Sequence, residues 1–369
     1  MSKGFKYFII VAGILFLAFI LWYFSAIITY ILVAAVLSLI GRPLADLLNR
    51  IRIKKFQFPK AASALITLFV IWLLIFTFFR VFIPLIAKEA QTLSQIDVQS
   101  ISKQLEQPLE KINGVLSDYN IGGILAGQSL EDFVAKKIES VLDFSNLTRL
   151  FSSVASFLGN IFIAFFSISF ITFFFLKDDR LFVRGIMTFV PPSKEENMHH
   201  ILSSIKYLLM RYFIGILIQI TCIIGLNTLG HTFIAGVNFS HALLIGLFAG
   251  VFNVIPYIGP ILGTALGLTI GLATHLHLEF YTGLLPLLAY MLGVFILVQL
   301  IDNVVFQPVI YSSSVKAHPL EIFLVILAAG YMGGIVGMIL AIPSYTVLRV
   351  IAKEFFTRYK WVQKITERI

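Results

Sequence analysis

Long apolar runs, separated by polar segments, set the pattern of this chain. A helix needs about 20 apolar residues to cross the hydrocarbon core of a bilayer, which is roughly 30 Å thick. Most of the runs come close to this length, and charged or turn-forming residues mark where each one ends. Together they predict six full transmembrane helices, at residues 7–24, 26–40, 61–86, 151–176, 207–229 and 282–301.

Two further apolar stretches, at residues 241–274 and 319–351, are interrupted in the middle. Pro256, Gly259 and Pro260 break the first stretch, and several glycines break the second. Each limb of the first stretch has about 15 residues, or about 22 Å of helix, which is too short for a full crossing. We therefore predict two re-entrant helical hairpins. The alternative is a pair of kinked helices in which the glycines and prolines are only structural.

Two polar segments differ from the apolar runs. The first, around residues 42–56, is rich in Arg and Lys and has leucines at helical spacing, which predicts an amphipathic helix at the membrane surface. The second, residues 87–150, has nine acidic and six basic residues and predicts a small helical extracytoplasmic domain. The expected fold is thus an all-α polytopic integral membrane protein. Its predicted parts are residues 1–86 (transmembrane helices 1–3), 87–150 (outer domain), 151–206 (transmembrane helix 4 and a cytoplasmic segment), 207–351 (transport core with both hairpins) and 352–369 (basic cytoplasmic tail).

The distribution of Lys and Arg predicts the orientation. When six spans are counted and each hairpin returns to the side it entered, 21 of the 28 basic residues fall on one side of the membrane. The short loops 231–240 and 275–281 on the other side have none. Basic residues favour the cytoplasmic side of short loops, so both termini are expected in the cytoplasm. The hairpins then enter from opposite faces, an arrangement that recurs in secondary transporters.

The composition agrees with a membrane protein. Hydrophobic residues make up 59% of the 369 residues and charged residues 13%, whereas soluble domains are about 45–50% apolar and about 25% charged. The net charge of +9 is interpreted as membrane orientation and contact with anionic lipid, not as nucleic-acid binding. Cys222 is the only cysteine, so an intrachain disulfide is impossible.

Common signatures of catalysis are missing from the sequence. It has no GxxxxGK[ST] phosphate loop, no HExxH zinc pair and no GxSxG elbow. His275 and His277 are only two residues apart, which does not favour a metal site. We therefore expect no cofactor, no bound metal and no enzymatic activity.

The first group of candidate site residues surrounds the tip of the first hairpin. A glycine there allows another backbone to come close, and prolines leave carbonyl groups without helical partners. Free carbonyls and an Asn amide could bind a polar solute or a cation; tight packing around a structural turn is the alternative. The group consists of Asn253, Pro256, Tyr257, Gly259 and Pro260.

A second group of polar residues follows the sixth predicted span. Ionisable groups at membrane depth are costly and usually face a cavity or a partner. Asp302, His318 and Glu321 are therefore the candidates for proton or cation coupling, although Asp302 could instead cap or pair at the interface. The further translocation candidates are Gln299, Asn303 and Gln307, with Gly333 and Gly334 at the tip of the second hairpin.

Five segments carry a resemblance to a known family. They are FNVIPYIGPILG (252–263), QLIDNVVFQPVIYSSSVKAHPLEIF (299–323), GGIVGMILAIP (333–343), FFFLKDD (173–179) and GRPLADLL (41–48). With these motifs, the sequence resembles the autoinducer-2 exporter family of bacterial membrane permeases.

The resemblance implies secondary transport, with export of the quorum-sensing signal autoinducer-2 in some members. Other members resemble sodium or lithium/proton antiporters. It also implies a homo-oligomer, a pentamer, in the bacterial plasma (inner) membrane, with a mobile unit that carries the hairpins. We expect export of a small polar solute driven by the proton-motive force. The alternatives are a monovalent cation/proton antiporter and a scaffold that recruits partners through residues 87–150.

Overall fold

The computed structural model shows a helical protein that divides into two compact units. It describes residues 12–94 apart from 14, 17, 18, 21, 54 and 55, residues 158–314 apart from 179, and residues 318–355. One unit comprises residues 1–76 and 155–213, and the other comprises residues 77–154 and 214–369. Most of the predicted outer domain, most of the predicted C-terminal tail and the start of the first predicted span lie outside the described residues.

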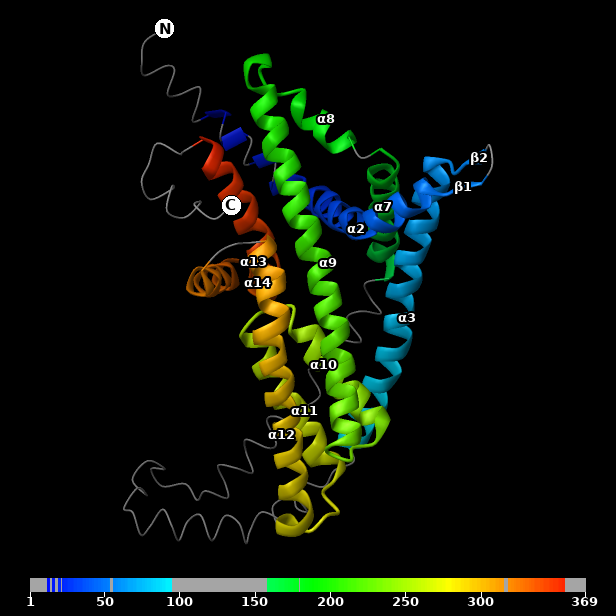
Figure 1. Ribbon diagram of the computed structural model, residues 1–369, viewed down its shortest axis with the longest axis vertical. Coiled ribbons are helices and arrows are strands. Elements are labelled where there is room, and N and C mark those ends of the chain that lie inside the picture. Colours follow the sequence, from blue (N-terminus) through cyan, green and yellow to red (C-terminus); the bar gives the residue numbers. More distant parts are fainter. Residues whose placement is uncertain are drawn as a thin grey trace. The chain divides into compact units, whose positions relative to one another are not determined.

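Helices make up nearly all of the described structure (Figure 1). The elements are α2 (Ser25–Arg50), β1 (Arg52–Ile53), β2 (Phe56–Gln57), α3 (Lys60–Ser94), α7 (Leu158–Lys177), α8 (Leu181–Met187), η2 (Pro192–Lys194), α9 (Glu195–Phe233), α10 (Phe239–Phe252), α11 (Ile258–Thr274), η3 (Phe280–Leu284), α12 (Leu285–Ile301), η4 (Asp302–Phe306), α13 (Gln307–Ser314) and α14 (Pro319–Phe355).

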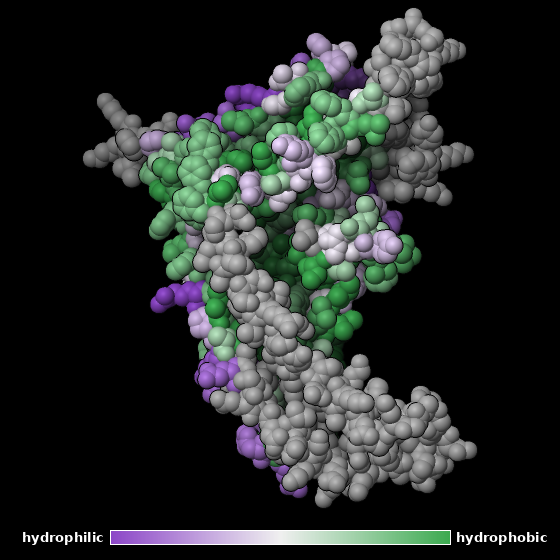
Figure 2. All heavy atoms as spheres, turned by 180° about the vertical axis from the view of Figure 1, so that it is seen from behind, coloured by the Kyte–Doolittle hydropathy of each residue, from purple (hydrophilic) through white to green (hydrophobic). Residues whose placement is uncertain are grey.

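Four helical segments among the described residues are long and apolar enough to cross a membrane. They are Ser25–Arg50, Lys60–Glu89, Pro192–Phe233 and Phe280–Ile310. Predicted spans 26–40, 61–86, 207–229 and 282–301 fall within them. Figure 2 shows hydrophobic side chains over much of the visible surface of the described residues. Phe69, Phe162 and Ile296 are among the large hydrophobic residues that are exposed in the structure. Such an apolar surface suits contact with lipid, so the chain is a membrane protein. The total of six full spans stays a prediction.

In the first unit, α2 packs along α7. Gly41 allows α2 to come close to α3 as well, because a Cβ atom there would press against Thr67 and Ile71. The guanidinium of Arg42 donates a hydrogen bond to the carbonyl of Leu176 over 3.3 Å. Helices that pack through small residues in this way are common in membranes.

The segment near residues 42–56 is helical as far as Arg50, and its place at the membrane surface stays a prediction. Residues 42–50 continue α2, which contains Pro43 and ends at Arg50. After Arg50 the chain forms the short antiparallel pair β1–β2, in which Arg52 faces Gln57 and Ile53 faces Phe56.

In the second unit, α10 and α11 form a helical hairpin and α11 also packs on α12. Glycines on α11 make this packing possible: a Cβ atom at Gly263 would meet Ala249 of α10, and one at Gly267 would meet Phe295 of α12. The buried apolar core of this unit includes Ile245, Ile270, Met291, Val294 and Phe295. Residues 239–274 are thus held as one packed element of this unit.

Helix α14 is also a hairpin, because its helical dihedral angles fail at Gly333 and Gly334. A Cβ atom at Gly337 would overlap the carbonyl oxygen of Ala329. Residues eight apart in a continuous helix lie about 12 Å apart, so the chain must fold back between them. Both predicted broken stretches therefore fold as helical hairpins, while their re-entrant placement in the bilayer stays a prediction.

A substitution at the turn of the second hairpin should lower stability. Gly334 has φ 58° and ψ −143°, a conformation open mainly to glycine. Gly334→Ala is expected to lower the free energy of unfolding by about 2 kcal/mol. Gly333→Ala is the matched control, because Gly333 has φ −135° and nothing lies within 4 Å of a Cβ atom added there. The measurement is thermal unfolding of both purified variants in detergent micelles. Equal losses in the two variants would contradict the proposed strain at Gly334.

Candidate functional site

Asp302 lies where α12 changes from an α-helical to a π-helical turn. The backbone N–H of Gln307 donates to the carbonyl of Asp302, which closes the i→i+5 bond of η4. In a regular α-helix, positions five apart point about 140° away from each other. The wider π turn aligns them, so both side chains reach the same place. Turns of this kind occur frequently at functional sites.

Three neutral amides surround the carboxylate of Asp302, which is fully buried. The Nε2 atom of Gln219, on α9, donates to Oδ1 over 2.6 Å. The Nε2 atom of Gln307 donates to Oδ2 over 2.8 Å. The Nδ2 atom of Asn253, in the turn of the first hairpin, lies 3.5 Å from Oδ2. We call Gln219, Asn253, Asp302 and Gln307 the polar centre.

The polar centre has no ion pair among the described residues. A buried carboxylate without a cationic partner is expensive, because burial removes its hydration. Amide donors reduce that cost but leave the negative charge in place. This arrangement is suited to a carboxylate that binds a proton or a small cation.

Asn303 extends the polar centre toward the surface. Its Oδ1 atom accepts hydrogen bonds from Nε2 of Gln299 over 3.0 Å and from Nε2 of Gln307 over 2.9 Å. Gln307 therefore connects Asp302 with Asn303. The structure brings together five of the sequence-predicted candidates in one network: Asn253, Gln299, Asp302, Asn303 and Gln307.

The other predicted residues of the first hairpin shape its turn. The carbonyl of Pro256 accepts a hydrogen bond from the N–H of Ile258, and Pro260 lies in the first turn of α11. Tyr257 has a positive φ of 68°, and its ring packs edge to face on Phe323 of α14 with centroids 5.7 Å apart. Tyr257 thus links the two hairpins.

His318 and Glu321 belong to a different set of contacts at the start of α14. The Nδ1 atom of His318 accepts a hydrogen bond from the N–H of Leu320 over 3.3 Å, which caps the helix. The hydroxyl of Tyr345, on the returning arm, donates to Glu321 over 3.0 Å. Arg349 lies 5.5 Å from the ring of Tyr345. The hydrogen bonds described for His318 and Glu321 do not involve Asp302. Gly333 and Gly334, the other predicted residues, form the turn of the second hairpin.

Gln219 is the member of the polar centre that sequence reasoning missed. It lies in the apolar run of α9, and a polar amide in a predicted span is itself a signal of an interhelical hydrogen bond. Its partner Asp302 is 83 residues away in sequence, so only the fold identifies the pair. Tyr345 and Arg349 were missed in the same way.

Loss of the Gln219 amide should destabilise the protein. Gln219→Leu is expected to lower the free energy of unfolding by about 2 kcal/mol, because Asp302 loses its shortest hydrogen bond while it stays buried. Thr221→Val is the control, since the Thr221 hydroxyl donates only to the carbonyl of Leu217 in the same helix. Thermal unfolding in detergent measures both. A Gln219→Leu variant as stable as Thr221→Val would show that the amide contributes nothing.

Among the described residues, no group of three or more His, Cys, Asp or Glu side chains could hold a metal ion. The absence of a cofactor stays a prediction.

Membrane-length apolar helices, two helical hairpins and a carboxylate buried among amides define a polytopic α-helical membrane protein. The model of the AI-2E family transporter matches residues 8–357, nearly the whole chain. The chain therefore belongs to this family, as its motifs indicated, and family membership indicates membrane transport.

Named relatives agree with this assignment. YueF of Bacillus subtilis (strain 168) is 27% identical over 344 residues, which cover 91% of this chain and 85% of YueF. YrrI of the same organism is 31% identical over 194 residues, covering 51% of this chain and 50% of YrrI. MJ1177 of Methanocaldococcus jannaschii is 25% identical over 248 residues, covering 67% of each chain. The names of all three describe them as candidate transport proteins.

Proposed function

We propose that this protein is a secondary transporter that exports a small polar solute, with the proton-motive force as its driver and autoinducer-2 as the first solute to test. The observation that carries the proposal is the full burial of Asp302 among amides from α9, the first hairpin and α13. Such a group can take up a proton on one side of the membrane and give it up when a substrate arrives. A membrane potential adds about 2.3 kcal/mol per charge per 100 mV to such a cycle.

The amides around Asp302 can serve both of its protonation states. With Asp302 ionised, its oxygens accept hydrogen bonds from the amide N–H groups. With Asp302 protonated, the carboxyl O–H needs an acceptor, and Oε1 of Gln219 has no hydrogen-bond partner among the described residues. Rotation of this amide would present Oε1 to the protonated carboxyl. Gln219 therefore supports uptake and release of the proton without a large rearrangement.

The hairpins supply the element that moves. Asn253 joins the polar centre from the turn of the first hairpin, and Tyr257 joins that turn to the second hairpin. Movement of the hairpins would therefore change the surroundings of Asp302 directly. Secondary transporters with broken helices use such motion for alternating access. In the proposed cycle, the solute binds near the hairpin turns as the proton leaves Asp302.

The second candidate function is a monovalent cation/proton antiporter for sodium or lithium. The chemistry of the polar centre favours it, because carboxylate and amide oxygens are hard ligands that suit small hard cations. In this alternative the cation replaces the proton on Asp302 itself. Glu321, hydrogen-bonded to Tyr345, is the second carboxylate that this function could use.

Transport by the purified protein in liposomes distinguishes the two functions. The liposomes carry a proton gradient, and separate samples receive autoinducer-2, sodium or lithium. Gradient-dependent movement of autoinducer-2 supports the exporter, and a sodium- or lithium-dependent collapse of the pH gradient supports the antiporter. Leakage identical to that of protein-free liposomes in all samples would rule out both.

The proposal also covers the membrane in which the protein lies, the orientation of its termini and its oligomeric state. We place the protein in the bacterial plasma membrane with both termini in the cytoplasm, on the evidence of the Lys and Arg distribution. A homo-oligomer, as the family resemblance implies, would cover part of the exposed apolar surface. Small-angle scattering or native mass spectrometry of the purified protein measures the number of subunits.

A further inference from the structure

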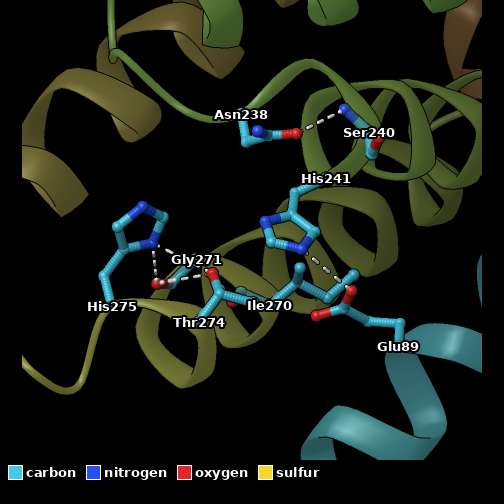
Figure 3. Close-up of polar contacts among 8 residues, drawn as sticks. All are labelled: Glu89, Asn238, Ser240, His241, Ile270, Gly271, Thr274 and His275. Atoms are coloured by element: carbon cyan, nitrogen blue, oxygen red, sulfur yellow. Dashed lines mark hydrogen bonds and ion pairs between the residues drawn. The ribbon is translucent and has the colours of Figure 1, made fainter.

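A titratable pair outside the polar centre connects α3 with the first hairpin. The Oε2 atom of Glu89, near the end of α3, lies 3.5 Å from Nε2 of His241 in the first turn of α10. Glu89 is only 4% exposed. Figure 3 shows the imidazole of His241 turned toward the Glu89 carboxylate, beside the turn that holds Asn238 and Ser240. The pair shares no residue with the polar centre.

Each member of the pair has one open polar atom. Oε1 of Glu89 and Nδ1 of His241 are buried and have no hydrogen-bond partner among the described residues. Buried polar atoms are normally satisfied, so two open atoms in one contact point to a ligand that is small enough to reach them. A metal ion fits poorly, since the described residues contain no third ligand to complete a metal site.

A proton suits these two atoms. A neutral His241 can donate its Nε2–H to Oε2 of Glu89, which leaves a net charge of −1 on the pair. One added proton, on Oε1 or on Nδ1, makes the pair neutral and keeps the contact. Burial penalises the charged form of the pair and therefore favours the added proton.

Among the described residues, Lys88 and His275 act electrostatically on the pair. The positive charge of Lys88, which precedes Glu89 on α3, favours the ionised form of Glu89 and disfavours the protonated form of His241. His275, after α11, acts electrostatically with His241 and with His277. Burial lowers the pKa of the His275 imidazole, whose Nδ1–H donates to the carbonyl of Gly271 over 3.0 Å, so His275 is mostly uncharged at neutral pH. Lys88 is thus the main positive neighbour of the pair in the part of the chain that the structure describes.

We propose that Glu89 and His241 form a one-proton binding site that ties α3 to the first hairpin and is separate from Asp302. The predicted topology places both residues on the extracytoplasmic side, where the proton-motive force supplies protons. Loss of the proton leaves a buried negative charge at this contact, so the site makes the attachment of the hairpin sensitive to the external pH. Proton binding by the Glu89–His241 pair does not depend on whether Asp302 takes part in transport.

Counting protons tests the site. Full-length protein in lipid nanodiscs is titrated from about pH 6 to about pH 9, and the protons released per chain are measured for the wild type and for Glu89→Gln. We expect Glu89→Gln to release about one proton fewer per chain. Glu279→Gln is the matched control, because Glu279 is an exposed carboxyl outside the pair, hydrogen-bonded to Thr282. Equal release by the wild type and Glu89→Gln would overturn the proposal.

A second variant keeps the test valid if Glu89→Gln fails to fold. In His241→Gln, the imidazole is gone and the proton has only the Glu89 carboxyl to occupy. The infrared spectrum at neutral pH should then show a protonated carboxyl band that is stronger than in the wild type or shifted from it. Identical bands in the two proteins would overturn the proposal.

Discussion

Asp302→Asn is expected to reduce gradient-coupled transport to the level of protein-free vesicles. Asparagine has nearly the shape of aspartate, and its amide can still bond with Gln219 and Gln307. It cannot bind a proton at neutral pH, however, and it cannot neutralise a cation. The variant should therefore fold but lose coupling, whether the substrate is a polar solute or sodium. The measurement is the substrate-dependent pH change in everted vesicles.

The control for this prediction is Glu279→Gln, which removes an exposed acidic group hydrogen-bonded to Thr282. It should leave the pH change at the wild-type level. Size-exclusion chromatography of both variants in detergent shows whether they are assembled normally. An Asp302→Asn variant with a wild-type signal would remove Asp302 from the mechanism.

Gly259→Ala is expected to have the second-largest effect, a loss of about 3 kcal/mol in the free energy of unfolding together with the loss of transport. A Cβ atom at Gly259 would overlap the carbonyl oxygen of Phe252 and come close to the backbone of Asn253. Backbone atoms cannot rotate away as a side chain can, so the turn must open. Opening the turn displaces Asn253 from Asp302.

The control for Gly259→Ala is Gly293→Ala. Gly293 is an exposed residue of α12, and nothing lies within 4 Å of a Cβ atom built there. Alanine favours helix over glycine by about 1 kcal/mol, so this variant should be as stable as the wild type or more stable. Thermal unfolding and vesicle transport measure both variants. Equal stability of the two would contradict the close packing of the hairpin turn.

Much of the fold could be predicted from local pattern. Apolar runs give long helices because a membrane offers no water to the backbone, so each spanning segment must satisfy its own hydrogen bonds. The breaks at Pro256–Pro260 and Gly333–Gly334 were also predictable, since proline removes a donor and glycine permits a positive φ. Both broken stretches indeed fold back as helical hairpins.

The end of α2 was harder to predict. The basic residues and the leucines near 42–56 are typical of a surface helix, but the same residues can equally extend the helix before them. Helical spacing is the same in both cases, so it does not decide between them. It also does not show that the helix ends at Arg50 and that residues 52–57 form the β1–β2 pair.

The candidate site was predictable in part for the same reason. Asp302, Asn303 and Gln307 are near neighbours in sequence. They form a group of polar residues directly after a predicted apolar span, so the sequence alone indicates the cluster. Gln219 and the Glu89–His241 pair were not visible in this way. Their partners lie on other helices, and only the folded chain brings these residues, which are far apart in the sequence, into contact.

Proton release on substrate binding tests the central claim, that Asp302 exchanges a proton for a substrate. Purified wild-type protein in weakly buffered detergent receives autoinducer-2, sodium or lithium, and the pH change is recorded. We expect release of about one proton per chain with the true substrate and no release from Asp302→Asn. Equal proton release from the wild type and Asp302→Asn would contradict it.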